Sequence, residues 1–276
     1  MRPRTSTGPG RLAGVLVVSV ISLKGGVGKT SVTLGLAGAA WERGIRTLVV
    51  DLDPQGNAST VLDPPEVRFT ASDVLSDPRP KLLAHAVARS GWGPAVDVIA
   101  ADSLLERHNA LAGRESTLRL RIAMGGLRGY DLVLVDSPPS LGGLTRNALA
   151  ASHVALVVAE PSLFALQGAA AALDAIELVR ADNLRLRPAG ILVNKLRAQS
   201  VEHRFRHDEL RLTYGDLVLR PPLLDRTAVQ QAEGACVPVQ AWRSPGAREI
   251  ADALDDHLEH LLARPVDAGP LGKGRR

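Results

Sequence analysis

The sequence of 276 residues has little cysteine, little lysine and no long apolar run. Its one cysteine, Cys236, excludes a disulfide within the chain and any Cys-rich zinc or iron–sulfur site built by one chain. The longest apolar stretches, such as residues 15–23, fall short of the roughly 20 residues that a membrane-crossing helix needs. The net charge, 33 − 29 = +4, is too small to indicate nucleic-acid binding by itself. With 45% hydrophobic and 22% charged residues, the composition is typical of a soluble globular protein of a reducing cytoplasm.

Short β-branched runs alternate with longer helical patterns, which is typical of an α/β protein. Most strand candidates are continuous apolar runs, so we expect a mostly parallel sheet with helices on both faces. The predicted strands are residues 15–22, 47–52, 96–100, 132–136, 154–159 and 190–194. The predicted helices are residues 29–43, 104–112, 116–127, 144–151, 163–181, 200–214 and 247–262, with a short helix near 71–75. We therefore predict one doubly wound domain, residues 15–264, between a flexible basic tail at 1–14 and a flexible tail at 265–276.

A glycine-rich segment directly follows the first predicted strand and leads into the first predicted helix. Its residues are Lys24, Gly25, Gly26, Val27, Gly28, Lys29, Thr30 and Ser31. Glycines let the backbone close around an anion, and the helix N-terminus adds a partial positive charge. In such a phosphate-binding loop, Lys29 reaches the outer phosphates and the Thr30 hydroxyl is a ligand of Mg²⁺. The segment therefore predicts a nucleotide triphosphate site.

The segment departs from the strict pattern G-x-x-x-x-G-K-[ST], because Leu23 stands at the first glycine position and is followed by Lys24. It resembles instead the deviant Walker A motif of the ParA/MinD family of ATPases. The resemblance implies a P-loop NTPase that binds ATP and Mg²⁺ and forms a homodimer around the nucleotide. In that family the extra lysine, here Lys24, crosses to the phosphates held by the other subunit. Lys24 and Lys29 would then be catalytic, and a monomer would be nearly inactive.

Three aspartates stand where further predicted strands leave the sheet. Asp51 and Asp53 lie in D-L-D-P-Q-G-N, and Asp136 ends an apolar run before S-P-P-S. Ligands of parallel sheets bind beyond the carboxyl ends of the strands, so we expect these carboxylates to face the phosphate loop. The first segment resembles the second motif of the ParA branch, which implies that Asp53 orients the attacking water and Asp51 holds the metal's hydration shell. Asp136 resembles the Walker B carboxylate, which binds Mg²⁺ directly or through water. A helix cap or Asx turn remains the alternative for Asp51 and Asp53.

Adenine is the predicted base. The segment V-N-K-L-R at residues 193–197 is similar to the guanine-binding N-K-x-D pattern of small GTPases. Arg197, however, replaces the aspartate that accepts the hydrogens of guanine N1 and N2. In the ParA/MinD family the adenine lies near the end of this strand and near a later proline-containing loop. The resemblance therefore implies contacts with Asn194 and Pro222.

The resemblance to ParA proteins spans residues 15–262 and implies a plasmid or chromosome partition ATPase associated with the nucleoid. Such proteins bind DNA without sequence preference as ATP-bound dimers and are reset by a ParB-like centromere-binding partner. This binding needs an arginine surface and no base-specific helix. The candidate DNA-binding residues are Arg197, Arg204, Arg206 and Arg211. Val201, Phe205 and Leu212 are expected on the buried side of the helix at 200–214. An ordinary solvated face remains the alternative.

Other branches of the family are possible. A MinD-like, membrane-associated positioning ATPase would attach through a basic amphipathic C-terminal helix, whereas the polar residues of the helix at 247–262 are mainly acidic. We therefore expect no membrane partner and predict that the apolar stripe of this helix packs in the core. A nitrogenase-reductase-like carrier needs two cysteines from each subunit and is excluded. A metabolic relative, such as an ATP-dependent synthetase, remains an alternative.

Overall fold

A computed structural model describes residues 14–110 and 113–264. Within these ranges the strands form one seven-stranded sheet in the order β3-β4-β2-β5-β1-β6-β7. Neighbouring strands pair in parallel, apart from the short β3, which is antiparallel to β4. The strands are β1 (Leu16–Ile21), β2 (Thr47–Asp51), β3 (Ala88–Arg89), β4 (Val96–Ile99), β5 (Leu132–Asp136), β6 (Val154–Ala159) and β7 (Arg187–Val193). The predicted tails at residues 1–14 and 265–276 lie outside the described residues, except for Gly14.

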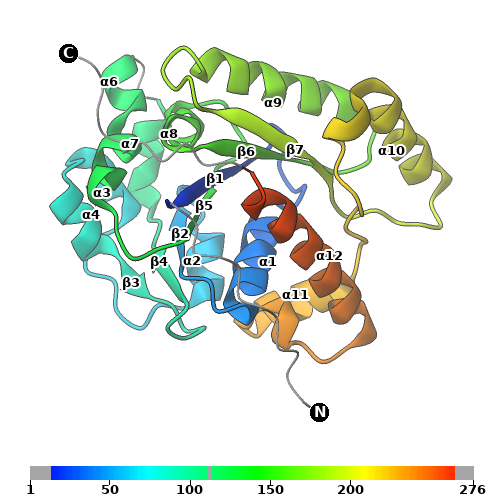
Figure 1. The fold of residues 1–276 in the computed structure, drawn as a ribbon, viewed down its shortest axis with the longest axis horizontal. Helices are drawn as coiled ribbons and strands as arrows, with labels where there is room; N and C mark the ends of the chain where they lie inside the picture. Colours follow the sequence, from blue (N-terminus) through cyan, green and yellow to red (C-terminus); the bar gives the residue numbers. More distant parts are fainter. Residues whose placement is uncertain (1–13, 111–112, 265–276) are drawn as a thin grey trace.

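Helices cover both faces of the sheet, so the predicted doubly wound α/β architecture is confirmed (Figure 1). One face carries α1 (Lys29–Glu42), α2 (Asn57–Leu62), α11 (Thr227–Gly234) and α12 (Pro245–Leu262). The other face carries α3 (Ala71–Ser76), α4 (Pro80–Ala86), α7 (Arg119–Ala123), α8 (Gly143–Ala151), α9 (Ala165–Val179) and α10 (Val201–Tyr214). Along β1, Val18 and Val20 pack toward α1, whereas Val17 and Ile21 pack toward the opposite helices. This alternation explains why the strands are apolar throughout.

The structure differs from the sequence prediction mainly in short elements. The helix predicted at 104–112 is the turn η1 (Ser103–Leu105) followed by α5 (Glu106–Asn109), and residues 111–112 lie outside the described ranges. The helix predicted at 116–127 is divided into α6 (Arg114–Thr117), α7 and the turn η2 (Met124–Gly126). Helices α2, α4 and α11, strand β3, and the turns η3 (Gly215–Leu217) and η4 (Val239–Ala241) were not predicted. Segments of two to eight residues give too few turns for a periodic pattern to be recognised.

The predicted buried side of α10 is wrong. Val201, Phe205 and Leu212 are 71%, 54% and 87% exposed, and the buried residue of this helix is Leu210. Helix α10 lies at the β7 edge of the sheet, near α9 (Figure 1), and it packs on the core through the buried Leu210 and the half-buried Tyr214. The apolar spacing on this helix therefore marks an exposed surface.

The C-terminal helix α12 behaves as predicted. Ile250, Leu254, Leu258 and Leu261 are buried against α1 and the sheet, which confirms the core packing of the apolar stripe. Among the described residues, no helix combines the length and the hydropathy that a membrane span requires.

Candidate active site

The glycine-rich loop joins β1 to α1 at the carboxyl end of the central strand. Gly26 and Gly28 have φ of 78° and 87°, in the left-handed region where a side chain is strained. A Cβ atom on Gly28 would also overlap the side-chain amide of Asn194. No side chain of the described residues caps the N-terminus of α1, so its first N–H groups are available to an anion. The loop therefore fits the predicted phosphate site.

Thr30 and Asp136 meet beside this loop, because β5 pairs with β1 and ends at Asp136. Thr30 Oγ1 donates a hydrogen bond to Asp136 Oδ2 (2.7 Å), and Thr33 Oγ1 donates to Asp136 Oδ1 (3.3 Å). Hydroxyl and carboxylate oxygens are the ligands that Mg²⁺ prefers, with phosphates and water completing its shell. Within the described ranges no group of three or more His, Cys, Asp or Glu residues could hold a metal by itself. Thr30 and Asp136 therefore fit a metal ion whose remaining ligands come from the phosphates of a bound nucleotide and from water.

Asp51 and Asp53 form a second set of acidic groups at the end of β2, which pairs with β5 so that Asp51 lies opposite Asp136. Asp51 Oδ2 accepts hydrogen bonds from the backbone N–H (2.8 Å) and the hydroxyl (2.7 Å) of Ser59, and Asp51 Oδ1 accepts one from the N–H of Asp53 (3.1 Å). Asp53 Oδ1 accepts from the N–H of Gln55 (3.0 Å). Both aspartates thus make the i to i+2 bonds of an Asx turn, and they do so next to the metal-site residues.

Burial makes the ionised carboxylates costly. It is the main cause that raises the pKa of Asp136 to about 7, with the charge of Asp51 second. It also raises the pKa of Asp51 to about 6, against the hydrogen bonds from Ser59. Burial lowers the pKa of Lys29, while the charges of Asp136 and Asp53 act in the opposite direction. A divalent cation would stabilise the ionised carboxylates, so the electrostatics of the site fit Mg²⁺.

Lys24 lies at the rim of the site. Its Nζ donates to Ser162 Oγ (3.1 Å) and to Glu160 Oε2 (3.4 Å), both in the loop after β6. The Lys24 side chain is 42% exposed, and the adjoining Leu163 and Phe164 are exposed as well. Ion pairs at such exposure contribute about 0–1 kcal/mol. Little free energy therefore opposes a rearrangement of Lys24 toward another molecule.

The end of β7 binds the outside of the phosphate loop. Asn194 Nδ2 donates to the carbonyl of Val27 (2.8 Å), and Lys195 Nζ donates to the carbonyl of Gly26 (2.6 Å). Pro222, the second predicted adenine contact, is half-buried in the segment that runs beside this strand end. The structure thus brings the two predicted adenine-binding segments together next to the loop.

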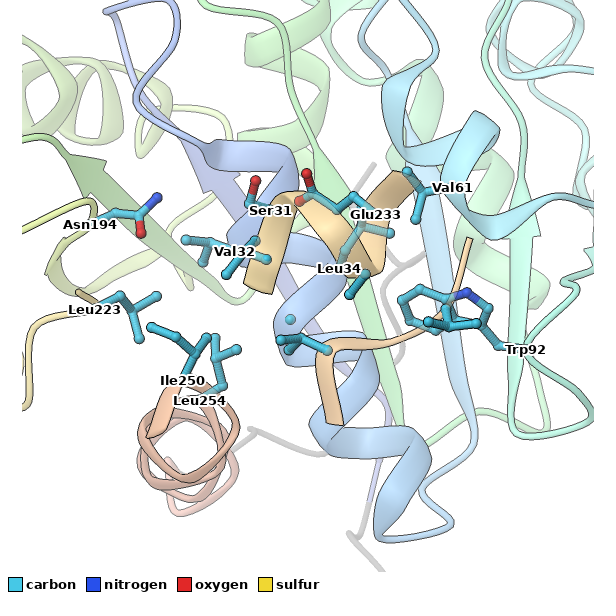
Figure 2. Close-up of a pocket in the computed structure, with 15 residues that line it drawn as sticks. Ser31, Val32, Leu34, Val61, Trp92, Asn194, Leu223, Glu233, Ile250 and Leu254 are labelled. Carbon is cyan, nitrogen blue, oxygen red and sulfur yellow. The ribbon is translucent and has the colours of Figure 1, made fainter. Parts of the chain in front are cut away.

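A pocket of about 430 Å³, open to solvent, adjoins this region between α1, α11 and α12. Figure 2 shows Ser31 and Glu233 close together at one end, with Ile250, Leu254 and Trp92 among the apolar side chains that line the rest. Burial raises the pKa of Glu233, and its hydrogen bond with Ser31 acts in the opposite direction. The polar end of the pocket is therefore the end that meets the phosphate loop.

Comparison with known proteins assigns the family. A family model described as an AAA domain matches residues 15–187. The chain is 36% identical to the chromosome-partitioning ATPase Soj of Thermus thermophilus, over 91% of this chain and 97% of Soj. It is 34% identical to the chromosome partitioning protein ParA of Caulobacter vibrioides, over 81% of this chain and 85% of ParA. The chain belongs to the ParA/Soj family of P-loop ATPases.

Solved structures agree with this family and with the predicted cofactors. The crystal structure of cobyrinic acid a,c-diamide synthase from Mycobacterium smegmatis, with bound ADP and magnesium, has a TM-score of 0.74 and 29% identity over 91% of this chain and 96% of that chain. A McdA–ATP complex of Cyanothece has a TM-score of 0.78 at 18% identity, over 89% and 96% of the two chains, and shares the fold. ATP and Mg²⁺ are therefore confirmed as cofactors of the family to which this chain belongs.

The four arginines proposed for DNA contact differ in their partners in this ParA/Soj family member. Arg206 forms ion pairs with Glu202 (2.7 Å) and Glu209 (2.8 Å) on its own helix. Arg197 pairs with Asp225 (2.8 Å), which raises the pKa of Arg197. Arg204 donates to the carbonyl of Ala198 (2.7 Å), whereas the half-buried Arg211 forms no ion pair within the described ranges. Arg204 and Arg211 are thus the two that no carboxylate pairs with among the described residues.

Several site contacts were not predicted. Glu160 and Ser162 lie more than 130 residues from Lys24, and no local pattern connects them. Ser59, which donates twice to Asp51, lies on a short helix that the sequence does not reveal. Lys195, which donates to the carbonyl of Gly26, was given no role at the loop, although its neighbours Asn194 and Arg197 in the same segment were interpreted. No local sequence pattern connects Lys195 with Gly26, which lies 169 residues earlier.

Proposed function

We propose that the chain is a Mg²⁺-dependent ATPase that partitions a plasmid or a chromosome. It dimerises when it binds ATP, then binds DNA without sequence preference and associates with the nucleoid, and a ParB-like partner resets it by stimulating hydrolysis. The single observation that carries this proposal is the meeting of Lys24, Lys29, Thr30 and Asp136 at one loop of a chain related to Soj and ParA.

The residues have the following roles. When bound, Mg²⁺ neutralises charge on the phosphates; Thr30 and Asp136 hold it, and Asp51 orders its water. Lys29 binds the outer phosphates, and Asp53 orients the water that attacks the γ-phosphate. Such hydrolysis needs positioning and charge stabilisation more than covalent chemistry from the protein.

Dimerisation would move Lys24 from Glu160 and Ser162 of its own chain to the phosphates of its partner. Two features support this step: the ion pair of Lys24 with Glu160 is partly exposed and weak, and the exposed apolar residues Leu163 and Phe164 follow Ser162 in the same loop. The DNA surface is the exposed side of α10, with Arg204 and Arg211 as phosphate contacts.

The test is binding to nonspecific duplex DNA by interferometry with ATP, with ADP and without nucleotide. We expect binding with ATP alone, because only ATP closes the dimer, and no binding by Lys24→Ala with ATP. Binding that does not depend on the nucleotide would contradict the proposal.

A metabolic function is the second candidate, because the chain is 28–30% identical to solved structures of a cobyrinic acid a,c-diamide synthase. A protein that hydrolyses ATP only with a carboxylic acid and an amide donor, and never binds DNA, would favour this candidate.

A further inference from the structure

Two neighbouring hydroxyl residues at the start of α1 face different parts of the fold. Thr30 Oγ1 donates to Asp136 Oδ2 at the end of β5 (2.7 Å). Ser31, the next residue, lies beside Glu233 of α11 and is hydrogen-bonded to it (Figure 2). Successive residues of a helix point about 100° apart, so the metal-site residues and Glu233 lie on different sides of the helix start.

This arrangement sets the direction in which a nucleotide leaves the phosphate loop. In the proposed function its outer phosphates lie at Lys29 and its metal ion lies at Thr30 and Asp136, on the side of β5. The nucleoside then leaves the loop on the side of Ser31, where the pocket between α1, α11 and α12 opens. The sugar joins the phosphates to the base, so it is the part of the nucleotide that passes the polar end of this pocket.

Glu233 supplies the carboxylate among the described residues that line the pocket, and its hydrogen bonding is incomplete. Its Oε1 atom is buried, and no described residue donates to it. Burial raises the pKa of Glu233, whereas its hydrogen bond with Ser31 and the charge of Lys195 act in the opposite direction. A buried acceptor without a donor costs free energy, which a hydroxyl group of a ligand would recover.

We propose that Glu233 recognises the sugar of the bound nucleotide by accepting a hydrogen bond from a ribose hydroxyl. Aspartate and glutamate carboxylates accept from ribose hydroxyls in other nucleotide-binding α/β folds, which shows that the two groups suit each other. Ser31 holds the carboxylate at the mouth of the pocket, and the nearby charge of Lys195 reduces its repulsion from the phosphates. The proposal deepens the proposed function and rests on it, since it needs a nucleotide on the phosphate loop.

The test is calorimetric binding of ADP and of 2′,3′-dideoxy-ADP, which lacks both ribose hydroxyls, in Mg²⁺. Diphosphates are used so that dimerisation does not enter the measured affinity. We expect the wild-type protein to bind ADP at least about tenfold more tightly than the dideoxy analogue, because a hydrogen bond to a charged group is lost.

Two variants test the residue. Glu233→Ala removes the acceptor, so we expect the ratio of the two affinities to fall to about two or less. Glu233→Gln keeps the size and one acceptor oxygen without the charge, and its ratio should lie between those of the wild-type protein and Glu233→Ala. The matched control is Glu249→Gln, which removes a carboxylate of the neighbouring α12 that is paired with Arg226 and should leave the ratio unchanged.

Three results would overturn the proposal. Equal affinity of the wild-type protein for the two nucleotides would do so without any variant, even if the substituted proteins failed to fold. A ratio that stays high in Glu233→Ala would show that another residue recognises the sugar. Equal weakening of both nucleotides would show that Glu233 only holds Ser31. If the wild-type protein bound neither nucleotide, the proposed function would fail as a whole, whereas ADP binding without selection would remove only this inference.

Discussion

The phosphate loop and the arginine-bearing helix α10 differ in how firmly their neighbours hold the functional side chains. Around the loop, Asp136 accepts from two hydroxyls and Asp51 from three donors, and both carboxylates are fully buried. On α10 Arg204 is exposed and Arg211 is half-buried, neither has a carboxylate partner among the described residues, and Arg206 is paired within its own helix. The carboxylates beside the loop are thus held in position before any ligand binds, whereas the unpaired arginines of α10 have few contacts that fix their side chains.

This difference sets the size of the effects to be expected. A preorganised, buried group loses its whole contribution when it is removed, because no neighbour can replace it. An exposed arginine acts through a screened charge that its neighbours share, so each removal costs little. Substitutions in the loop should therefore have large effects, and substitutions on α10 should have small, additive ones.

Lys29→Ala gives the largest expected effect. Lys29 is buried at the loop, and we expect its removal to lower ATP turnover by about 10³-fold and to weaken nucleotide binding. Steady-state phosphate release and calorimetry with ADP measure the two losses. Lys81→Ala, on the exposed start of α4, is the matched control. Near-normal ATP turnover in Lys29→Ala would show that the phosphates of ATP do not bind at this loop.

Lys24→Ala should separate dimerisation from nucleotide binding. Because the Lys24 side chain contacts the half-buried Glu160 and Ser162 at the rim of the site, we expect ADP affinity to stay within about twofold while turnover falls about 10²-fold. Light scattering with ATP should show a monomer in place of a dimer. A variant that still dimerises and turns over ATP normally would show that Lys24 acts only within its own chain.

The sequence was most informative where one segment by itself carries the chemistry. The loop, the first residues of α1 and the carboxylates that end β2 and β5 follow from strand–loop–helix order, because parallel strands end at one edge. The exposed face of α10 was predicted wrongly, since apolar spacing shows which residues share a side and not whether that side is covered. The contact of Lys24 with Glu160 depends on β1 and β6 being neighbours in the sheet, which only the folded chain reveals.

Asp136→Asn tests the electrostatic cost of the preorganised site. The pKa values of Asp136, about 7, and of Asp51, about 6, lie above the value of about 3.9 expected for an unfolded aspartate. The folded protein then binds more protons, so without Mg²⁺ and nucleotide its free energy of unfolding should fall as pH rises from about 4 to 7. Asparagine at position 136 should remove the larger part of this decrease in the free energy of unfolding. It also removes the negative charge of Asp136, which raises the pKa of Lys29.

Urea unfolding at pH 5, 6 and 7.5 measures this effect. We expect Asp136→Asn to be the more stable protein at pH 7.5, by up to about 4 kcal/mol, because each pH unit between the folded and the unfolded pKa corresponds to about 1.4 kcal/mol. The variant should lose most of this advantage at pH 5, where the carboxyl group of the parent protein is protonated in the folded state and only about one pH unit separates the solution from the unfolded pKa. Asp216→Asn, at an exposed carboxylate, should follow the parent protein. An equal pH dependence in Asp136→Asn and the parent would show that burial costs the carboxylate little.

The double substitution Arg204→Glu/Arg211→Glu should have the smallest effect on each measured quantity. We expect ATP turnover without DNA to be unchanged, and DNA affinity at physiological salt to fall by about tenfold. The slope of log affinity against log salt should decrease by about one for each lost phosphate contact. Arg206→Glu is the informative comparison, because Glu202 and Glu209 already neutralise that arginine, and its reversal should change the slope less. If Arg206→Glu weakened DNA binding more than the double substitution, the ion pairs of Arg206 would have to open when DNA binds. The ion pairs seen in the free protein would then not predict which arginines contact DNA.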